Sequence, residues 1–230
     1  LDSDNHPHIS YYDNSNTDLK YAYHDGAEWQ TEIVDSQGIV GSYTSIALDS
    51  QDLPHISYFD YTNYDLKYAF FDGSRWHNQT LDSNGNVGRY TSLAVDSNDR
   101  PHISYVDYSY SDLKYTAYDG TNWQTETVDL QGPHDAYTSI ALDSNDRPHI
   151  SYHDNSNRDL KYAIFDGSIW RTEIVDTEGG EASSLALDDK DIPHISYDCS
   201  TGGYGYYLKY TTLDYDPPIL LSDKSPDFAT

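Results

Sequence analysis

The protein has 230 residues, of which 39 are acidic and 13 are basic, giving a net charge of −26. Such an acidic chain repels phosphate groups, so nucleic acids and anionic membrane surfaces are not expected partners. No apolar run approaches the ~20 residues that a membrane-spanning helix needs, and the single cysteine, Cys199, cannot form an internal disulfide.

The sequence PHISY occurs five times, beginning at Pro7, Pro54, Pro101, Pro148 and Pro193. These prolines are 47, 47, 47 and 45 residues apart. A fixed period in this range indicates one supersecondary unit that is used repeatedly, as in solenoids and propellers. We therefore divide the chain into units 1–47, 48–94, 95–141, 142–186 and 187–230.

Each unit contains four short segments rich in β-branched and aromatic residues, which favour strands. In the clearest copy these are YTSIALD (43–49), PHISYFD (54–60), DLKYAFF (65–71) and RWHNQTLD (75–82). An Asp-Gly pair before the last strand is typical of a hairpin turn, because glycine accepts a positive φ. No segment has a 3.6-residue period over helical length. The sequence therefore predicts an all-β protein built from antiparallel four-stranded units.

Five four-stranded repeats are the pattern of a five-bladed β-propeller, in which neighbouring blades cover each other's faces. At this level the chain resembles the five-bladed propellers of the tachylectin-2 type, which are sugar-binding lectins. The LDS-x-D-x-PHISY hairpin is also similar to the opening of extracellular propeller repeats. The resemblance covers the whole chain as architecture. The tachylectin sugar-binding motif, the Asp-box of sialidases and the WD dipeptide are absent from the sequence, so no binding residue is carried over from these families.

A propeller must join its last blade to its first, and unit 1 lacks the YTSIA half of its innermost strand. We expect the C-terminal segment 225–230 to supply that half-strand beside residues 7–12, with 217–223 as the outer strand of the last blade. A free tail is the alternative.

Histidine and lysine recur at fixed positions of the repeat. The two sets are His8, His55, His102, His149 and His194, and Lys20, Lys67, Lys114, Lys161 and Lys209. We interpret both sets as structural, with each histidine between blades facing a carbonyl or carboxylate. A lysine held within a strand needs a partner, because an unpaired buried ammonium costs several kcal/mol, roughly. The candidate partners are Asp13, Asp60, Asp107 and Asp154.

Two sets of aromatic residues are candidate ligand-binding positions. They are Trp29, Trp76, Trp123 and Trp170 after the Asp-Gly turns, and Tyr43, Tyr90 and Tyr137 before the inner strands. Aromatic faces can stack on the C–H surface of a sugar. The tryptophans can equally fill the gap between blades, and both interpretations stay open.

Paired aspartates flank the loop between the second and third strands of units 1 to 4. They are Asp13 and Asp18, Asp60 and Asp65, Asp107 and Asp112, and Asp154 and Asp159. Carboxylate pairs on a tight loop can bind Ca²⁺. Turn capping by aspartate is the alternative, and we expect no required cofactor.

These features favour a secreted or cell-surface recognition module that binds glycans at several equivalent shallow pockets between blades. A structural or protein-interaction domain of a surface assembly is one alternative. A polysaccharide-acting enzyme is the other. It would need a unique pair of carboxylates near the propeller axis, yet the inner strands are near copies of one another. We therefore expect binding without catalysis.

Overall fold

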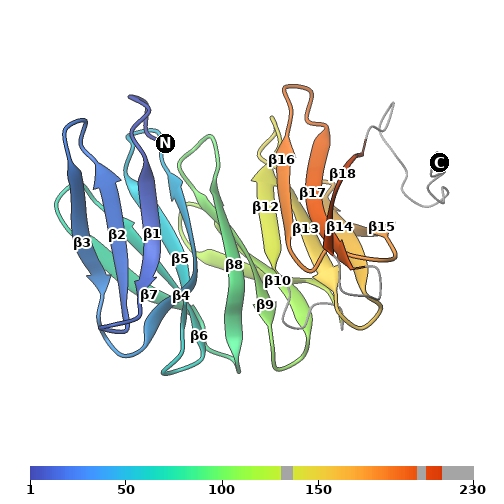
Figure 1. The fold of residues 1–230 in the computed structure, drawn as a ribbon, viewed down its shortest axis with the longest axis horizontal. Coiled ribbons are helices and arrows are strands. Elements are labelled where there is room, and N and C mark those ends of the chain that lie inside the picture. Colours follow the sequence, from blue (N-terminus) through green and yellow to red (C-terminus); the bar gives the residue numbers. More distant parts are fainter. Residues whose placement is uncertain (131–136, 201–205, 214–230) are drawn as a thin grey trace. The chain divides into compact units, whose positions relative to one another are not determined.

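The computed structural model describes residues 1–130, 137–200 and 206–213 (Figure 1). Every regular element in these ranges is a β-strand. The described residues therefore contain no helix long and apolar enough to cross a membrane. The strands form five antiparallel sheets, which we call blades 1 to 5 in chain order. The chain divides into two compact units, Leu1–Asp135 with blades 1 to 3 and Ala136–Thr230 with blades 4 and 5.

The first unit contains eleven strands among its described residues. Blade 1 consists of β1 (His8–Asp13), β2 (Asp18–His24) and β3 (Trp29–Asp35). Blade 2 consists of β4 (Val40–Leu48), β5 (Pro54–Asp60), β6 (Asp65–Phe71) and β7 (Trp76–Asp82). Blade 3 consists of β8 (Val87–Val95), β9 (Pro101–Asp107), β10 (Asp112–Tyr118) and β11 (Trp123–Asp129).

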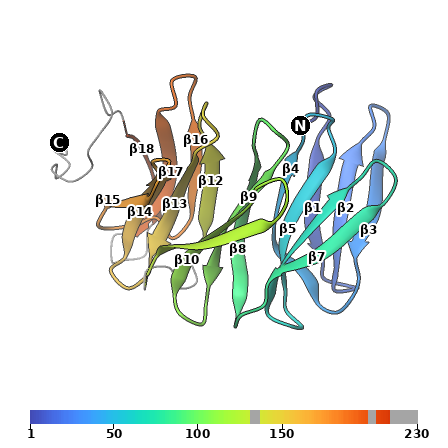
Figure 2. The same cartoon turned by 180° about the vertical axis from the view of Figure 1, so that it is seen from behind.

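The second unit repeats this order, as the view from behind also shows (Figure 2). Blade 4 consists of β12 (Thr138–Leu142), β13 (Pro148–Asp154), β14 (Asp159–Phe165) and β15 (Trp170–Asp176). Blade 5 consists of β16 (Ser183–Leu187), β17 (Pro193–Ser200) and β18 (Tyr206–Thr212).

The all-β prediction is confirmed, and the five sheets with a 47-residue repeat match the content of a five-bladed β-propeller. The predicted strands 54–60 and 65–71 agree with β5 and β6, and the other two differ by a few residues at their ends. Blade 1 has three described strands, which agrees with the absence of the YTSIA half of the innermost strand from unit 1. The predicted closing segment 225–230 and outer strand 217–223 lie outside the described residues.

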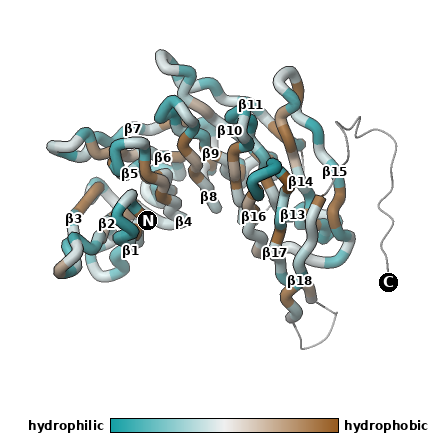
Figure 3. The backbone as a smooth tube through the Cα atoms, turned by 90° about the horizontal axis from the view of Figure 1, so that it is seen from above, coloured by the Kyte–Doolittle hydropathy of each residue, from teal (hydrophilic) through white to brown (hydrophobic). Residues whose placement is uncertain are grey.

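Burial on both faces of the second strand explains why the blades need one another. All seven residues of β5 are buried, and β9 and β13 have the same pattern. Successive strand residues point to opposite faces, so both faces of each of these strands are buried. Ile56 and Tyr58 have no exposed surface and pack with Leu19, Tyr21 and Val40 in a core that spans blades 1 and 2. Figure 3 shows hydrophobic stretches along the strands and hydrophilic connections between them.

Neighbouring blades approach so closely that glycine is required at their contact. Gly41 has φ +99°, and a Cβ there would lie 2.7 Å from the Cα of Leu19 in blade 1. Gly88 repeats this arrangement against Leu66 of blade 2, at 2.5 Å with φ +96°. A side chain would therefore meet both backbone strain and a clash with main-chain atoms.

Within each unit, a polar cluster joins neighbouring blades. Between blades 1 and 2, Asp35 at the end of β3 accepts hydrogen bonds from the Tyr58 hydroxyl (2.7 Å) and the Lys67 ammonium. Asp82 occupies the equivalent position between blades 2 and 3, with Tyr105 at 2.7 Å and Lys114 at 3.2 Å. In the second unit, Asp176 contacts Tyr197 and Lys209, both at 2.8 Å.

The predicted lysine partners are therefore only partly correct. Lys20 pairs with Asp13 at 2.7 Å, Lys114 lies 3.6 Å from Asp107, and Lys161 lies 3.7 Å from Asp154. Lys67 instead pairs with Asp35 of the preceding blade. The carboxylate of Asp60 accepts hydrogen bonds from the backbone and side chain of the loop that follows it, so its oxygens already have other donors.

Candidate functional site

Two recesses lie between neighbouring blades of the first unit, at the end of the blades where the PHISY strands begin. The blade 1/2 pocket has a volume of about 300 Å³ and the blade 2/3 pocket about 500 Å³. The blade 1/2 pocket is lined by Asp2, His6, His8, Tyr21, Tyr23, His24, Asp25, Glu32, Asp52, Leu53, Pro54 and Phe71. The blade 2/3 pocket is lined by His55, Tyr68, Phe70, Gln79, Asp99, Pro101, Tyr118, Thr121, Asn122 and Trp123.

The two pockets are copies of one site. Seven lining positions of one pocket lie 47 residues before a lining position of the other. These pairs are His8/His55, Tyr21/Tyr68, Tyr23/Phe70, Glu32/Gln79, Asp52/Asp99, Pro54/Pro101 and Phe71/Tyr118. The repeat that builds the fold therefore also builds the recess, and it places the same kinds of side chain around it.

The recurrent histidine contributes to each pocket. Nδ1 of His55 lies within hydrogen-bonding distance of the Tyr68 hydroxyl, and its Nε2 is 3.5 Å from a carboxylate oxygen of Asp49. Because Nε2 faces a carboxylate, it carries the proton, and Nδ1 accepts the hydrogen bond from tyrosine. Burial lowers the pKa of His55, although Asp49 opposes this effect, so the imidazole is neutral at pH 7.

The same aspartate–histidine–tyrosine arrangement occurs in the other blades. It comprises Asp2–His8–Tyr21, Asp96–His102–Tyr115, Asp143–His149–Tyr162 and Asp188–His194–Tyr210. The structure thus places a carboxylate beside each histidine, and that carboxylate belongs to the same blade. The tyrosine partner was missed at the sequence level. Its signal is the LKY tyrosine, 13 residues after the histidine in four of the five units.

In the first unit, two of the candidate tryptophans bridge neighbouring blades. Trp123 of blade 3 packs edge-to-face on Tyr68 of blade 2, with ring centroids 5.1 Å apart, and also lines the pocket. Trp76 packs on Tyr21 in the same way at 5.3 Å, and its indole N–H donates to Glu32 at 2.8 Å. Trp29 is 49% exposed and contacts His24. Trp170 contacts Phe165 of its own blade.

The tyrosines before the inner strands lie away from the pockets. Tyr43 and Tyr90 lie in the first halves of β4 and β8, toward the end of each strand that is farther from the pockets. Their ring centroids are 4.4 Å apart, and their φ values are 52° and 53°. Burial raises the pKa of Tyr43. Tyr137 is 52% exposed.

The aspartate loops also lie at that opposite end. The structure places each pair in direct cross-strand register, as for Asp13 with Asp18 and Asp60 with Asp65. The first carboxylate of each loop accepts backbone N–H groups, for example from Ser15 to Asp13 at 3.0 Å. Among the described residues, no three His, Cys, Asp or Glu side chains are grouped so as to hold a metal ion.

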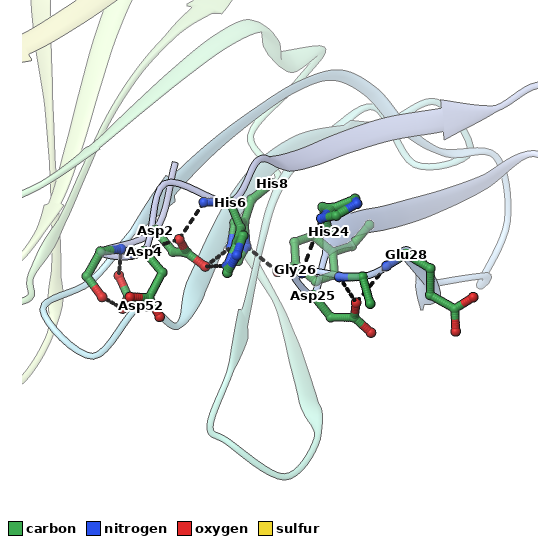
Figure 4. Close-up of polar contacts among 12 residues, drawn as sticks. Asp2, Asp4, His6, His8, His24, Asp25, Gly26, Glu28 and Asp52 are labelled. Carbon is green, nitrogen blue, oxygen red and sulfur yellow. Dashed lines mark hydrogen bonds and ion pairs between the residues drawn. The ribbon is translucent and has the colours of Figure 1, made fainter.

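The polar contacts of the blade 1/2 pocket are shown in Figure 4. Asp2 accepts the backbone N–H of His6 at 2.7 Å, and the imidazoles of His6 and His8 lie 3.2 and 3.3 Å from its other oxygen. Burial alone would raise the pKa of Asp2, but these hydrogen bonds outweigh it and lower the pKa to about 2. Hydrogen bonds from the backbone N–H groups of Glu28 and Ala27 lower the pKa of Asp25 to about 2.

The polar groups that sequence reasoning missed are those of the outer strands and hairpin tips. Glu32 and Gln79 occupy equivalent positions on β3 and β7, and Asp52 and Asp99 occupy equivalent turns. Asp99 accepts the backbone N–H and the hydroxyl of Ser50 at 2.8 and 2.7 Å, and these bonds hold its pKa below the usual range. A concave site with aromatic walls and a few fixed polar groups can bind a small polyhydroxylated ligand.

No known family profile matches the chain, and no curated protein matches its sequence. Among solved structures, a mutant of AofleA from Arthrobotrys oligospora matches with a TM-score of 0.63 and 12% identity, over 90% of this chain and 66% of AofleA. The lectin SapL1, in complex with alpha methyl fucoside, has a TM-score of 0.58 and 14% identity, over 92% of this chain and 82% of SapL1. The NanB sialidase from Streptococcus pneumoniae has a TM-score of 0.56 and 14% identity, over 86% of this chain and 36% of NanB.

This chain thus spans just under two thirds of AofleA. At such low identity the matches show the fold alone. The resemblance to sugar-binding propellers is confirmed at that level.

Proposed function

We propose that the protein is a secreted or cell-surface recognition module that binds glycans in the pockets between its blades. The observation that carries this proposal is the recurrence of one recess at a 47-residue interval, with aromatic walls and polar groups at matching positions. A gap that served packing alone would not need amide and carboxylate groups around an aromatic recess.

The blade 2/3 pocket has the chemistry that a sugar requires. Phe70, Tyr118 and Trp123 supply aromatic surface for C–H groups. Gln79 and Asn122 carry amides that both donate and accept hydrogen bonds, as sugar hydroxyls do. The fold that this chain shares with SapL1, which was solved with alpha methyl fucoside, supports the same class of ligand.

Repetition of the site favours multivalent attachment. Two weak sites on one chain raise the overall affinity for a polymer whose sugars reach both, because the second contact becomes intramolecular. The strong negative charge favours uncharged or cationic glycans over sulfated or phosphorylated ones.

We propose binding without turnover. A glycosidase needs one carboxylic acid with a raised pKa as general acid. In the blade 1/2 pocket, the pKa values of Asp2 and Asp25 are about 2, and the pKa of Asp99 in the other pocket is also lowered. These three carboxylates are therefore ionised at neutral pH and suit hydrogen-bond acceptance rather than acid catalysis.

A glycan array followed by calorimetry on the best ligand tests the proposal. We expect binding with more than one site per chain, and Trp123→Ala should remove the blade 2/3 site. Trp29→Ala is the matched control, because Trp29 is exposed and lines neither pocket. The absence of binding to any glycan on the array would favour a structural or protein-interaction module. Release of reducing sugar from a bound polymer would favour an enzyme.

A further inference from the structure

The two pockets share a frame but differ in charge. We propose that the blade 1/2 pocket selects a sugar that carries a free amino group, whereas the blade 2/3 pocket takes a neutral sugar. This inference rests on the proposed function, since it assigns a ligand class to one of the two glycan sites.

The first difference is a carboxylate in place of an amide. Glu32 lines the blade 1/2 pocket where Gln79 lines the other. The indole N–H of Trp76 donates to Oε2 of Glu32 at 2.8 Å and fixes the carboxylate against the next blade. A carboxylate accepts about four hydrogen bonds, so this contact leaves capacity for a ligand N–H. Gln79 is uncharged and therefore provides no ionic attraction for an ammonium group.

The second difference is the set of other charged groups. Asp2, Asp25 and Asp52 line the blade 1/2 pocket together with Glu32, and none of its described lining residues is lysine or arginine. In the blade 2/3 pocket the lining carboxylate is Asp99. A recess with four carboxylates produces a negative potential that a protonated amine reduces and a hydroxyl does not.

Two additional histidines complete the contrast. His6 and His24 occupy positions that carry Leu53 and Phe71 in the next repeat. Nδ1 of His6 faces the carboxylate of Asp2 at 3.2 Å, so a neutral His6 has an unprotonated Nε2 that can accept an N–H from an ammonium. Nδ1 of His24 accepts the backbone N–H of Gly26 at 3.1 Å, which leaves its protonated Nε2 as a donor for a sugar hydroxyl.

The arginine of the adjoining hairpin does not neutralise this site. Arg75 lies in the hairpin after Phe71, at the position equivalent to Asn122 of the other pocket. Its side chain is 74% exposed, and its Nε lies 3.3 Å from His77 and 3.9 Å from Asp72 of the same hairpin. It is therefore directed toward its own blade.

Reciprocal variants test the assignment, because each pocket provides the natural substitution for the other. The probes are the methyl glycosides of glucosamine and glucose, and of galactosamine and galactose, which within each pair differ only in an ammonium or a hydroxyl. Binding is followed by NMR at neutral pH through the indole N–H signals, with Trp76 reporting on the blade 1/2 pocket and Trp123 on the blade 2/3 pocket. Trp76→Phe and Trp123→Phe assign those signals.

We expect the Trp76 signal to shift at lower concentrations of the amino sugar than of its neutral partner. Glu32→Gln should reduce this preference about fivefold, the factor expected for a partly screened charge pair. Gln79→Glu should introduce the preference at Trp123, and Arg75→Asn should leave it in place at Trp76. Equal responses to both members of each pair, with binding intact, would overturn this inference and leave the proposed function standing. No response to any saccharide here or on the glycan array would overturn both.

Discussion

The buried cluster between blades 1 and 2 gives the most direct test of how the blades are held together. Asp35 is 3% exposed and receives the Lys67 ammonium and the Tyr58 hydroxyl from the neighbouring blade. Lys67 is 9% exposed and Tyr58 is fully buried. Asp35→Asn removes the charge while keeping the shape and one acceptor oxygen.

The expected loss in free energy of unfolding follows from burial. Removing one partner of a buried ion pair costs about 3–5 kcal/mol, because the remaining charge has no counter-ion. The asparagine oxygen still accepts from Tyr58, so we place the loss at the lower end, about 3 kcal/mol. The equivalent change in blade 4, Asp176→Asn, leaves Lys209, whose side chain is 41% exposed. Water can solvate that ammonium, so the expected loss there is about 1 kcal/mol or less.

Urea unfolding, followed by tryptophan fluorescence, gives the free energy of unfolding of each single variant for comparison with the unsubstituted protein. A third protein, with Asp35→Leu, Tyr58→Phe and Lys67→Met together, should recover most of the loss, because it buries neither an unpaired charge nor an unsatisfied hydroxyl. Equal losses for Asp35→Asn and Asp176→Asn would refute this reasoning, since they would show that burial does not set the cost.

Three further predictions concern the frame and the loops. Gly88→Ala should lower the free energy of unfolding by at least about 2 kcal/mol, because it adds a clash with Leu66 to the strain of a positive φ. Gly73→Ala is the control, since it has similar backbone strain but no atom within 4 Å of the new Cβ. In thermal unfolding, Gly73→Ala should therefore destabilise the protein clearly less than Gly88→Ala. Ser50→Ala removes the hydroxyl hydrogen bond to Asp99, one of the two Ser50 bonds that depress the pKa of Asp99, and keeps the backbone one. A depressed carboxyl pKa stabilises the fold above the unfolded value of about 3.9, so the stability lost in Ser50→Ala should be full at pH 6 and shrink as the pH falls through the folded pKa of Asp99. A pH-independent loss in urea titrations would contradict this. EDTA should leave the thermal midpoint unchanged, because hydrogen bonds already cap the loop aspartates, whereas a lower midpoint restored by Ca²⁺ would show that these loops bind metal.

The periodic features of the fold could be predicted because they are local. PHISY and DLKY place apolar and polar residues at strand spacing, and the Asp-Gly pairs supply the hairpin turns. The strands at 54–60 and 65–71 were therefore predicted to the residue. The recurrence of the unit then implied that equivalent blades cover one another.

The contacts between blades could be predicted only in part, because they join residues far apart in sequence. Lys67 is 32 residues from Asp35, whereas the nearer Asp60 was the obvious candidate. From the sequence, Glu32 and Gln79 are polar residues of outer strands, and the residues around them in β3 and β7 give no indication of a recess. Only the register of two neighbouring blades shows that these side chains and the PHISY histidines surround one space.

Comparison of the repeats with one another separates the demands of folding from those of binding. Ile56, Ile103, Ile150 and Ile195 occupy one position of the repeat in blades 2 to 5 and have no exposed surface, whereas the equivalent Ile9 of blade 1 is 45% exposed. A change there would leave a cavity or a clash. Glu32 is half-buried and Gln79 is exposed, so this pocket position can change between the repeats at little cost in stability. A frame of this kind can carry sites for different sugars at a fixed spacing. Such a module would bind a chain that mixes amino and neutral sugars more tightly than a polymer of either sugar alone, because only the mixed chain satisfies both pockets.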